Sequence, residues 1–266
     1  MFFQQYPSLE SEYSKKSFCS DANHFPLVLL HGWGTHSGVW NRVRDCLSSY
    51  DLHAPDLPGY GNNSSVSPYT LDTLTAYLIE NLPPYFDLCG WSLGGLLAIK
   101  IAKAFPHRVR KLVLVNASPC FVSKNDWPHG IEKSTLLRFM NDLSDDCMAM
   151  LRRFIYLQVK GSEFENKESE YLREILNSRR KPEHASLMSG LNILIETDLR
   201  DLLVEVANPT LVIHGCKDIL VPVAAGIWIS KQLPQSYLLR IEPAAHVPFV
   251  SHPVEFCLNL RRFLND

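Results

Sequence analysis

Six short, continuous runs of apolar residues, separated by stretches of helical periodicity, constrain the fold of this 266-residue chain more than any other feature. The runs cover residues 26–30, 52–55, 86–89, 111–115, 210–213 and 236–241. Runs of this kind are typical of strands buried on both faces of a parallel sheet. Between them leucines recur every three or four residues, as at Leu71, Leu74, Leu78 and Leu82, which indicates helices with one apolar face. The alternation predicts β-α-β crossovers and a mostly parallel, doubly wound α/β sheet.

The sheet pattern is interrupted between residues 118 and 200. This span holds no convincing buried strand, but it contains amphipathic helical segments at residues 136–143, 148–159 and 168–178. We therefore predict an α/β core formed by residues 1–117 and 201–266. Residues 118–200 would form a helical lid inserted between two strands and placed over one end of the sheet.

Composition narrows the class of protein further. Hydrophobic residues make up 46% of the chain and charged residues 20%, which is ordinary for a globular protein. No apolar stretch reaches the length of about 18 residues that a membrane span needs. A net charge of -2 argues against a protein that binds phosphate backbones. We expect a monomer with no nucleic-acid partner and no membrane partner.

Seven cysteines lie singly, at positions 19, 46, 89, 120, 147, 216 and 257, with no Cys-x-x-Cys pair and no Cys/His ligand spacing. That pattern is typical of reduced thiols in a cytosolic chain, and it indicates neither a metal nor an organic cofactor. Residues 1–6 show no basic segment followed by an apolar one, so we predict no secretory signal. The expected location is the cytoplasm.

A Gly-x-Ser-x-Gly motif occupies residues 90–94, directly between an apolar run and a helical stretch. On a sharp turn from strand to helix the serine backbone is strained, and side chains at the glycine positions would collide across the turn. The free N–H groups of the helix that begins there favour developing negative charge. We predict that Ser92 is a catalytic nucleophile, against the simpler interpretation of a serine in a glycine-flanked turn.

A serine hydroxyl needs a base that removes its proton and an acid that orients the base. Asp218 follows the run at residues 210–213, and His246 follows the run at 236–241. Both therefore lie past the carboxyl ends of predicted strands, where open α/β sheets bind ligands. The order Ser, Asp, His is also the one that this strand–turn–helix arrangement uses. We predict Asp218 as the acid and His246 as the base, against a loop-capping carboxylate and a surface imidazole.

Other histidines have simpler explanations. His252 is the nearest rival base, but it precedes Pro253 at the start of a predicted helix. His31 and His214 end apolar runs, where we expect structural hydrogen bonds.

An oxyanion hole needs two N–H donors. Leu93, the residue after the predicted nucleophile, supplies one by position, and the loop after the first apolar run would supply the other. Trp33 lies in that loop between two glycines, which let the backbone fold back toward an acyl oxygen. We predict that Trp33 also contacts substrate, against ordinary core packing of its ring.

With these motifs in place, the chain resembles the α/β-hydrolase superfamily over essentially its whole length. His-Gly-Trp-Gly at residues 31–34, Asp-Leu-Pro-Gly-Tyr-Gly at 56–61 and Gly-Trp-Ser-Leu-Gly-Gly at 90–95 carry the resemblance. More particular motifs are Ser-Pro-Cys-Phe at 118–121, Asp-Trp-Pro at 126–128 and Ser-His-Pro at 251–253. With them the chain resembles the carboxylesterases that hydrolyse the methyl ester of pimeloyl-acyl-carrier protein in biotin synthesis.

That resemblance implies a reaction and roles for residues. Ser92, Asp218 and His246 would be the catalytic triad, and the reaction would release methanol from the far end of an acyl chain still attached to its carrier. The residues that would contact the substrate are Trp33, Leu93, Phe154, Leu157 and Gln158. Because methanol offers little to recognise, selectivity would come from a narrow apolar tunnel built by lid residues, Val159 among them.

The implied partner is an acidic acyl-carrier protein, which a basic lid surface would attract. Between residues 131 and 190 ten Lys and Arg residues are balanced by ten Asp and Glu residues, so the predicted lid is neutral in sum. Its basic residues are clustered nevertheless. The residues that we predict to dock the carrier are Arg152, Arg153, Arg179, Arg180 and Lys181. A solvated helix face would explain the same clusters.

Other functions stay open on the sequence alone. A C–C bond hydrolase of ring-cleavage products, or a promiscuous short-chain esterase, would use the same fold and triad. A hydrolase-like binding protein without catalysis is a further alternative, although such proteins usually lose a triad member. Serine at position 92 excludes the aspartate-nucleophile chemistry of dehalogenases and epoxide hydrolases.

Overall fold

The computed structural model describes residues 25–266, and within them the six apolar runs form one sheet of six strands. The strands are β1 (Leu27–Leu30), β2 (Leu52–His53), β3 (Phe86–Trp91), β4 (Val109–Val115), β5 (Thr210–Gly215) and β6 (Ser236–Ile241). Their order is β2-β1-β3-β4-β5-β6, and every neighbouring pair is parallel. The prediction of a parallel α/β sheet is confirmed. The expectations about residues 1–6 and Cys19 fall outside the described residues.

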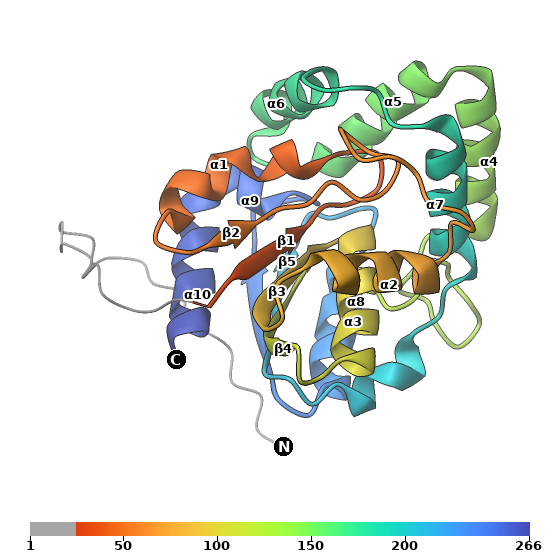
Figure 1. Cartoon of the computed structure of the whole chain (residues 1–266). Coiled ribbons are helices and arrows are strands. Elements are labelled where there is room, and N and C mark those ends of the chain that lie inside the picture. The colour runs from red at the N-terminus through yellow and green to blue at the C-terminus, as the bar shows by residue number, and fades with distance from the viewer. Residues whose placement is uncertain (1–24) are drawn as a thin grey trace.

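Helices cover both faces of the sheet, as the doubly wound prediction requires (Figure 1). One face carries α1 (Asn41–Arg44), α9 (Pro248–Ser251) and α10 (Pro253–Asn265), and the other carries α2 (Leu71–Asn81), α3 (Leu93–Ala104) and α8 (Val223–Gln232). The three 3-10 helices among the described residues are Ser37–Trp40, Asp45–Leu47 and Arg200–Glu205. With both faces covered, all six residues of β3 are buried, which explains why the sequence of that strand is continuously apolar apart from Asp87.

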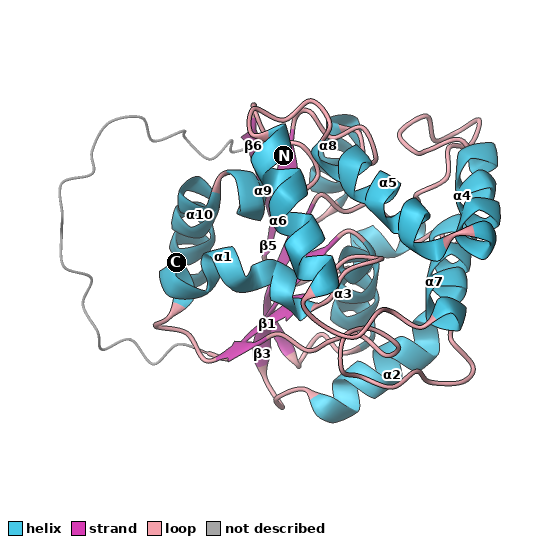
Figure 2. Ribbon diagram, turned by 90° about the horizontal axis from the view of Figure 1, so that it is seen from above, coloured by secondary structure: helices cyan, strands magenta, loops and turns pink. Residues whose placement is uncertain are grey.

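Four further helices follow β4 and precede β5: α4 (Lys133–Asp145), α5 (Cys147–Val159), α6 (Glu165–Asn177) and α7 (His184–Glu196). We call them the lid helices, since they gather at one end of the sheet, which Figure 2 views from above. The helical periodicity predicts α4, α5 and α6 within a few residues of their bounds. Helix α7 is harder to recognise because Gly190 interrupts its apolar face, where a Cβ would lie 2.7 Å from Cδ1 of Trp33.

A buried ion pair joins the two central strands. Asp87 on β3 is fully buried, and Arg110 on β4 donates to its two oxygens from Nε at 2.8 Å and Nη2 at 2.6 Å. Burial raises the pKa of Asp87 despite the neighbouring guanidinium. Arg110 also donates to the carbonyl oxygen of Leu264 at 2.8 Å and so ties the end of α10 to the sheet.

In the part of the chain that the structure describes, every helix is too short or too polar to cross a bilayer.

Candidate active site

Ser92 lies on a sharp turn between β3 and α3. Its φ of 54° and ψ of −117° place a residue with a side chain in a sparsely populated region. The turn is tight on both sides: a Cβ at Gly90 would lie 2.3 Å from the carbonyl oxygen of Gly94, and one at Gly94 would lie 2.4 Å from that of Leu30. Ser92 is 4% exposed, so its hydroxyl stands at the edge of the buried interior rather than in bulk water.

Asp218 lies in the loop after β5 and is held by the main chain of that loop. Its Oδ1 accepts hydrogen bonds from the N–H groups of Leu220 at 2.8 Å and Val221 at 2.9 Å. Its Oδ2 lies 2.6 Å from Nδ1 of His246. Burial pushes the pKa of Asp218 upward, but the His246 imidazole and these hydrogen bonds outweigh it, and the pKa lies below its ordinary value. The carboxyl is therefore ionised at neutral pH and accepts the bond from the imidazole.

His246 is fixed at three points in the loop after β6. Its N–H donates to the carbonyl oxygen of Gln158, at the end of lid helix α5, at 2.9 Å. Its own carbonyl accepts from Nε1 of Trp91 at 2.9 Å, and its Nδ1 is engaged by Asp218. Nε2 is therefore the ring nitrogen left to exchange a proton with a substrate or a nucleophile.

The loop after β1 passes directly beside the nucleophile turn. A Cβ added at Gly32 would lie 3.1 Å from the Cβ of Ser92, so the next residue, Trp33, follows the point of closest approach. Leu93 begins α3, where N–H groups have no partner inside the helix. The loop that carries Trp33 and the turn that precedes Leu93 therefore lie side by side. The N–H groups of these two residues are the donors that the sequence predicts for an oxyanion hole.

Trp33 connects this loop with the lid helices. Its Nε1 donates to the carbonyl oxygen of Leu187 on α7 at 2.9 Å, and its ring meets Phe154 on α5 edge-on, with centroids 4.9 Å apart. Further along α5, Leu157 is half-buried and Gln158 is 1% exposed. Within the described residues neither polar atom of the Gln158 side chain has a hydrogen-bond partner. A buried amide without partners is costly unless something else satisfies it, which makes Gln158 a candidate contact for a polar substrate group.

The other histidines make contacts of their own. His252 caps the junction of α9 and α10, where Nδ1 lies 2.8 Å from the hydroxyl of Ser251 and Nε2 lies 3.7 Å from a carboxylate oxygen of Glu163. His31 and His214 are fully buried and bond to main-chain groups. Burial lowers the pKa of His31 to about 4, so its ring is neutral under physiological conditions.

Asn116 also lies at this site, although the sequence alone does not single it out. It follows β4 directly, and its Nδ2 donates to Oδ2 of Asp218 at 2.6 Å. The sequence offers one signal for Asn116, namely that it is a polar residue at the carboxyl end of a buried strand, as Asp218 and His246 are. An asparagine there is so often a turn residue that position alone does not select it.

The predicted carrier-docking residues differ in their surroundings. Arg153 pairs with Asp142 at 2.8 Å and remains mostly exposed. Arg179 pairs with Asp56 at 2.8 Å, in the turn at residues 56–61, and its charge is compensated there. Arg152, Arg180 and Lys181 are also exposed.

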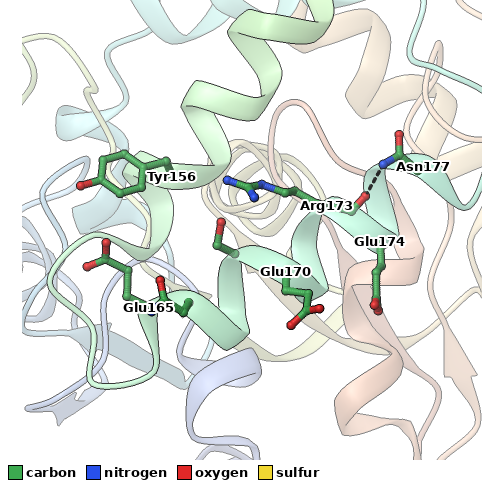
Figure 3. A pocket seen from close by; sticks show the side chains of 8 residues that line it. Tyr156, Glu165, Glu170, Arg173, Glu174 and Asn177 are labelled. Carbon is green, nitrogen blue, oxygen red and sulfur yellow. Dashed lines mark hydrogen bonds between the residues drawn. The ribbon is translucent and has the colours of Figure 1, made fainter.

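A separate pocket of about 700 Å³ lies between α5 and α6, lined by Tyr156 and by α6 residues (Figure 3). Its charged lining residues are Glu165, Glu170, Arg173 and Glu174. Acidic groups predominate, and no predicted triad residue lines it. This pocket is therefore a feature of the lid surface, distinct from the cluster around Ser92.

Comparison with protein families gives a match to the model described as alpha/beta hydrolase fold over residues 26–253. A relative from Nitrosomonas europaea, named pimeloyl-[acyl-carrier protein] methyl ester esterase, is 43% identical over 231 residues, covering 86% of this chain and 92% of its own length. A relative of the same name from Salmonella newport is 41% identical over 232 residues, covering 87% and 90%.

Solved structures give the same fold. An esterase from Exiguobacterium antarcticum superposes with a TM-score of 0.83 at 24% identity, covering 91% of this chain and 92% of that one. A bromoperoxidase from Bacillus anthracis superposes with a TM-score of 0.84 at 25% identity, covering 92% and 93%. Over these shared lengths the fold matches closely while the sequences have diverged.

Proposed function

The chain belongs to the alpha/beta hydrolase family, and on that premise we propose that it is a serine carboxylesterase that hydrolyses the methyl ester of pimeloyl-acyl-carrier protein in biotin synthesis. The observation that carries the proposal is the strained Ser92 turn together with the 2.6 Å contact between Asp218 and His246. Relatives named for that reaction, at about 40% identity over most of their length, supply its substrate class.

The geometry suits acyl transfer through Ser92. Its Oγ attacks the ester carbonyl while Nε2 of His246 takes the hydroxyl proton, and Asp218 stabilises the imidazolium that forms. The backbone N–H groups of Leu93 and Trp33 would stabilise the negative charge on the carbonyl oxygen. Collapse of the intermediate breaks the ester bond, and the imidazolium protonates the departing methoxy oxygen. Water then attacks the acyl-serine with His246 again as base, which releases the free acid and restores Ser92.

The lid residues account for selectivity in this proposal. The rings of Phe154 and Trp33 meet at right angles and, with Leu157, would offer an apolar wall for the acyl chain. The unpartnered amide of Gln158 would meet a polar group of the substrate. We propose the division into a core of residues 1–117 and 201–266 and a lid of residues 118–200, because the substrate would lie between them.

The carrier would approach the exposed basic residues of the lid. Arg152, Arg180 and Lys181 are exposed, and Arg153 keeps most of its surface in solvent. The charge of Arg179 is already compensated by Asp56, and the pocket between α5 and α6 is acidic, so neither adds to the attraction. The protein would act as a cytoplasmic monomer that binds the carrier only transiently.

The decisive experiment uses a strain that lacks its own esterase for this step. The wild-type chain should restore growth without biotin and the Ser92→Ala variant should not, while purified wild type should release methanol from the carrier-bound methyl ester. If wild type hydrolyses small esters but neither rescues growth nor acts on the carrier-bound ester, the chain is a general esterase. If Ser92→Ala retains hydrolysis, the mechanism itself is wrong.

A second experiment tests the docking surface. Combined reversal of Arg152, Arg153, Arg180 and Lys181 to Glu should slow hydrolysis of the carrier-bound ester by about fourfold or more, since exposed pairs each contribute about 0.2–1 kcal/mol. Turnover of a p-nitrophenyl ester should hardly change. Glu170→Lys, on the acidic pocket, is the matched control and should not slow either substrate. Phe154→Ala should slow both, because that ring would line the acyl site.

A further inference from the structure

Asn116 lies in the interior of the site in a backbone conformation that few residues adopt. It is fully buried, and its φ of 42° falls in the left-handed region, where asparagine and glycine are the residues most often tolerated. Its N–H donates to the carbonyl oxygen of Ile213 on β5 at 2.9 Å. The main chain thus turns sharply at the end of β4 and aims the side chain across the ends of β5 and β6.

The side-chain amide of Asn116 bonds to three parts of the site at once. Nδ2 donates to Oδ2 of Asp218 at 2.6 Å and to the carbonyl oxygen of Ala245, the residue before His246, at 3.2 Å. Oδ1 accepts from the N–H of Gly215, at the end of β5, at 3.3 Å. One amide therefore joins the acid, the strand that leads to the acid, and the loop that carries the base.

We propose that Asn116 is a positioning residue of the esterase, one that holds the Asp218 carboxylate ionised and fixes its Oδ2 toward His246. The proposal rests on the proposed function, because it assigns a role within that triad. The two oxygens of Asp218 accept hydrogen bonds from different groups. Oδ1 accepts from two main-chain N–H groups, whereas Oδ2 accepts from the side chains of His246 and Asn116. Without the amide, Oδ2 would rely on the imidazole alone for its orientation.

The residue type fits this role for a chemical reason. An amide N–H donates at every pH, so it stabilises the carboxylate without titrating. A leucine of similar size offers no donor, and an aspartate would place a second carboxyl within hydrogen-bond distance of Asp218, where both cannot remain ionised. Asparagine combines a donor that does not titrate with tolerance of the left-handed backbone.

The first test removes the amide and keeps the backbone conformation. In Asn116→Gly we expect kcat for a p-nitrophenyl ester to fall about 10- to 100-fold with KM little changed, because misplaced catalytic groups slow the chemical step more than substrate binding. Asn208→Gly is the matched control: Asn208 is a buried asparagine that bonds to the carbonyl oxygens of Pro106 and Val109, near the start of β4. It should lower thermal stability and leave kcat unchanged.

The second test separates positioning from a merely structural role. In Asn116→Asp the new carboxyl can donate to Asp218 while it is protonated and cannot once it ionises. We therefore expect this variant to exceed Asn116→Gly in kcat at acid pH and to lose that advantage above neutral pH, in a profile measured from about pH 5 to about pH 9. The proposal is overturned if Asn116→Gly keeps wild-type kcat, or if Asn116→Asp is no better than Asn116→Gly at any pH.

These results can be told apart from failure of the proposed function. Both tests use a small ester, so they do not depend on the carrier as the true substrate. If hydrolysis survives Ser92→Ala, the triad assignment is wrong, and so is any role for Asn116 within it. If hydrolysis depends on Ser92 but substitutions at Asn116 do not change kcat, only the positioning role is overturned.

Discussion

Ser92 is held in a conformation that costs about 1–3 kcal/mol for a residue with a side chain, with φ at 54°. The flanking glycines and the helix that follows impose that conformation. The same turn places the Ser92 hydroxyl at the end of the sheet, so the strain is linked directly to the placement of the proposed nucleophile. Replacing Ser92 with glycine should therefore lower activity while it relieves the backbone strain.

We predict that Ser92→Ala and Ser92→Gly both lower hydrolysis of a p-nitrophenyl ester by about 10³-fold or more, since triad members act as a unit. Ser92→Gly should in addition be more stable than Ser92→Ala, by about 1 kcal/mol in free energy of unfolding, because glycine adopts this conformation without strain. Its unfolding temperature should be correspondingly higher. Calorimetry of both variants measures the difference. A glycine variant no more stable than the alanine variant would show that the turn is not strained.

His246 and His252 provide a second comparison at the residue scale. His246→Ala should abolish hydrolysis to the level of Ser92→Ala, because its Nδ1 is bonded to Asp218. His252→Ala should retain most activity, since that ring contacts Ser251 and Glu163 instead. Parallel measurement of kcat/KM for the two variants checks the assignment, and the reverse ranking would mean that the base has been misidentified.

Ser92, Asp218 and His246 can be proposed as a triad from the sequence alone, because each follows a buried strand and belongs to a residue type that acid–base chemistry requires. Asn116 follows a strand as well, but its proposed role depends on three hydrogen bonds that connect the ends of three strands. Such a bond depends on the order of strands in the sheet, which a single sequence does not specify. The same holds for the main-chain bond between Gln158 and His246.

The strands are predictable as elements because burial on both faces leaves an uninterrupted apolar run, whose ends the sequence marks within two residues. Helix α7 is less evident, since close packing against Trp33 requires Gly190 in its middle. Polar residues inside strands are also informative: Asp87 interrupts β3, and its partner Arg110 lies on the neighbouring strand β4.

Arg110→Ala should lower the free energy of unfolding by about 3–5 kcal/mol, because it removes the counter-ion of a buried carboxylate and leaves it mainly a main-chain hydrogen bond from Lys111. The double variant Asp87→Asn, Arg110→Ala should lose less, since an amide is cheaper to bury than a charge. Urea unfolding at pH 8 measures both. Equal losses in the single and double variants would mean that the stability comes from packing of Arg110 and not from charge pairing.

Helix α6 introduces a pH dependence of stability through Glu168. That side chain is fully buried, the Ser162 hydroxyl donates to one of its oxygens, and the other has no partner among the described residues. Burial raises the pKa of Glu168 to about 7, against weaker opposing effects from Ser162 and Arg42. The folded protein therefore holds this proton more tightly than the unfolded chain, whose carboxyl titrates near its ordinary value.

The contribution of protonated Glu168 to the free energy of unfolding is fully present below about pH 4.5. It declines as pH rises toward 7, where Glu168 ionises in the folded form as well. Glu168→Gln should remove this contribution and stabilise the protein at pH 8 by up to about 3 kcal/mol. Unfolding of wild type and variant, compared at acid and alkaline pH, gives the difference. A stability gap that is the same at both pH values would argue against titration of Glu168.

On the scale of the whole molecule, a net charge of -2 gives no general attraction for an acidic carrier. On our proposal, attraction would arise locally, from the exposed basic residues of the lid helices. We expect kcat/KM for the carrier-bound methyl ester to fall several-fold as salt rises from about 50 mM to about 500 mM, because screening over a few ångströms removes the steering. A p-nitrophenyl ester assayed in parallel should be insensitive to salt, and matching salt effects on the two esters would contradict docking by charge.

The bond from the N–H of His246 to the carbonyl oxygen of Gln158 is made entirely of main-chain atoms. Mutation replaces side chains, so single substitutions on α5 leave both of its atoms in place. Over evolutionary time the lid helices can therefore acquire new side chains, and new preferences among acyl chains, while the bond that attaches them to the proposed general base is kept. Related proteins can then diverge in substrate preference while the same main-chain bond continues to hold the residue at the position of His246.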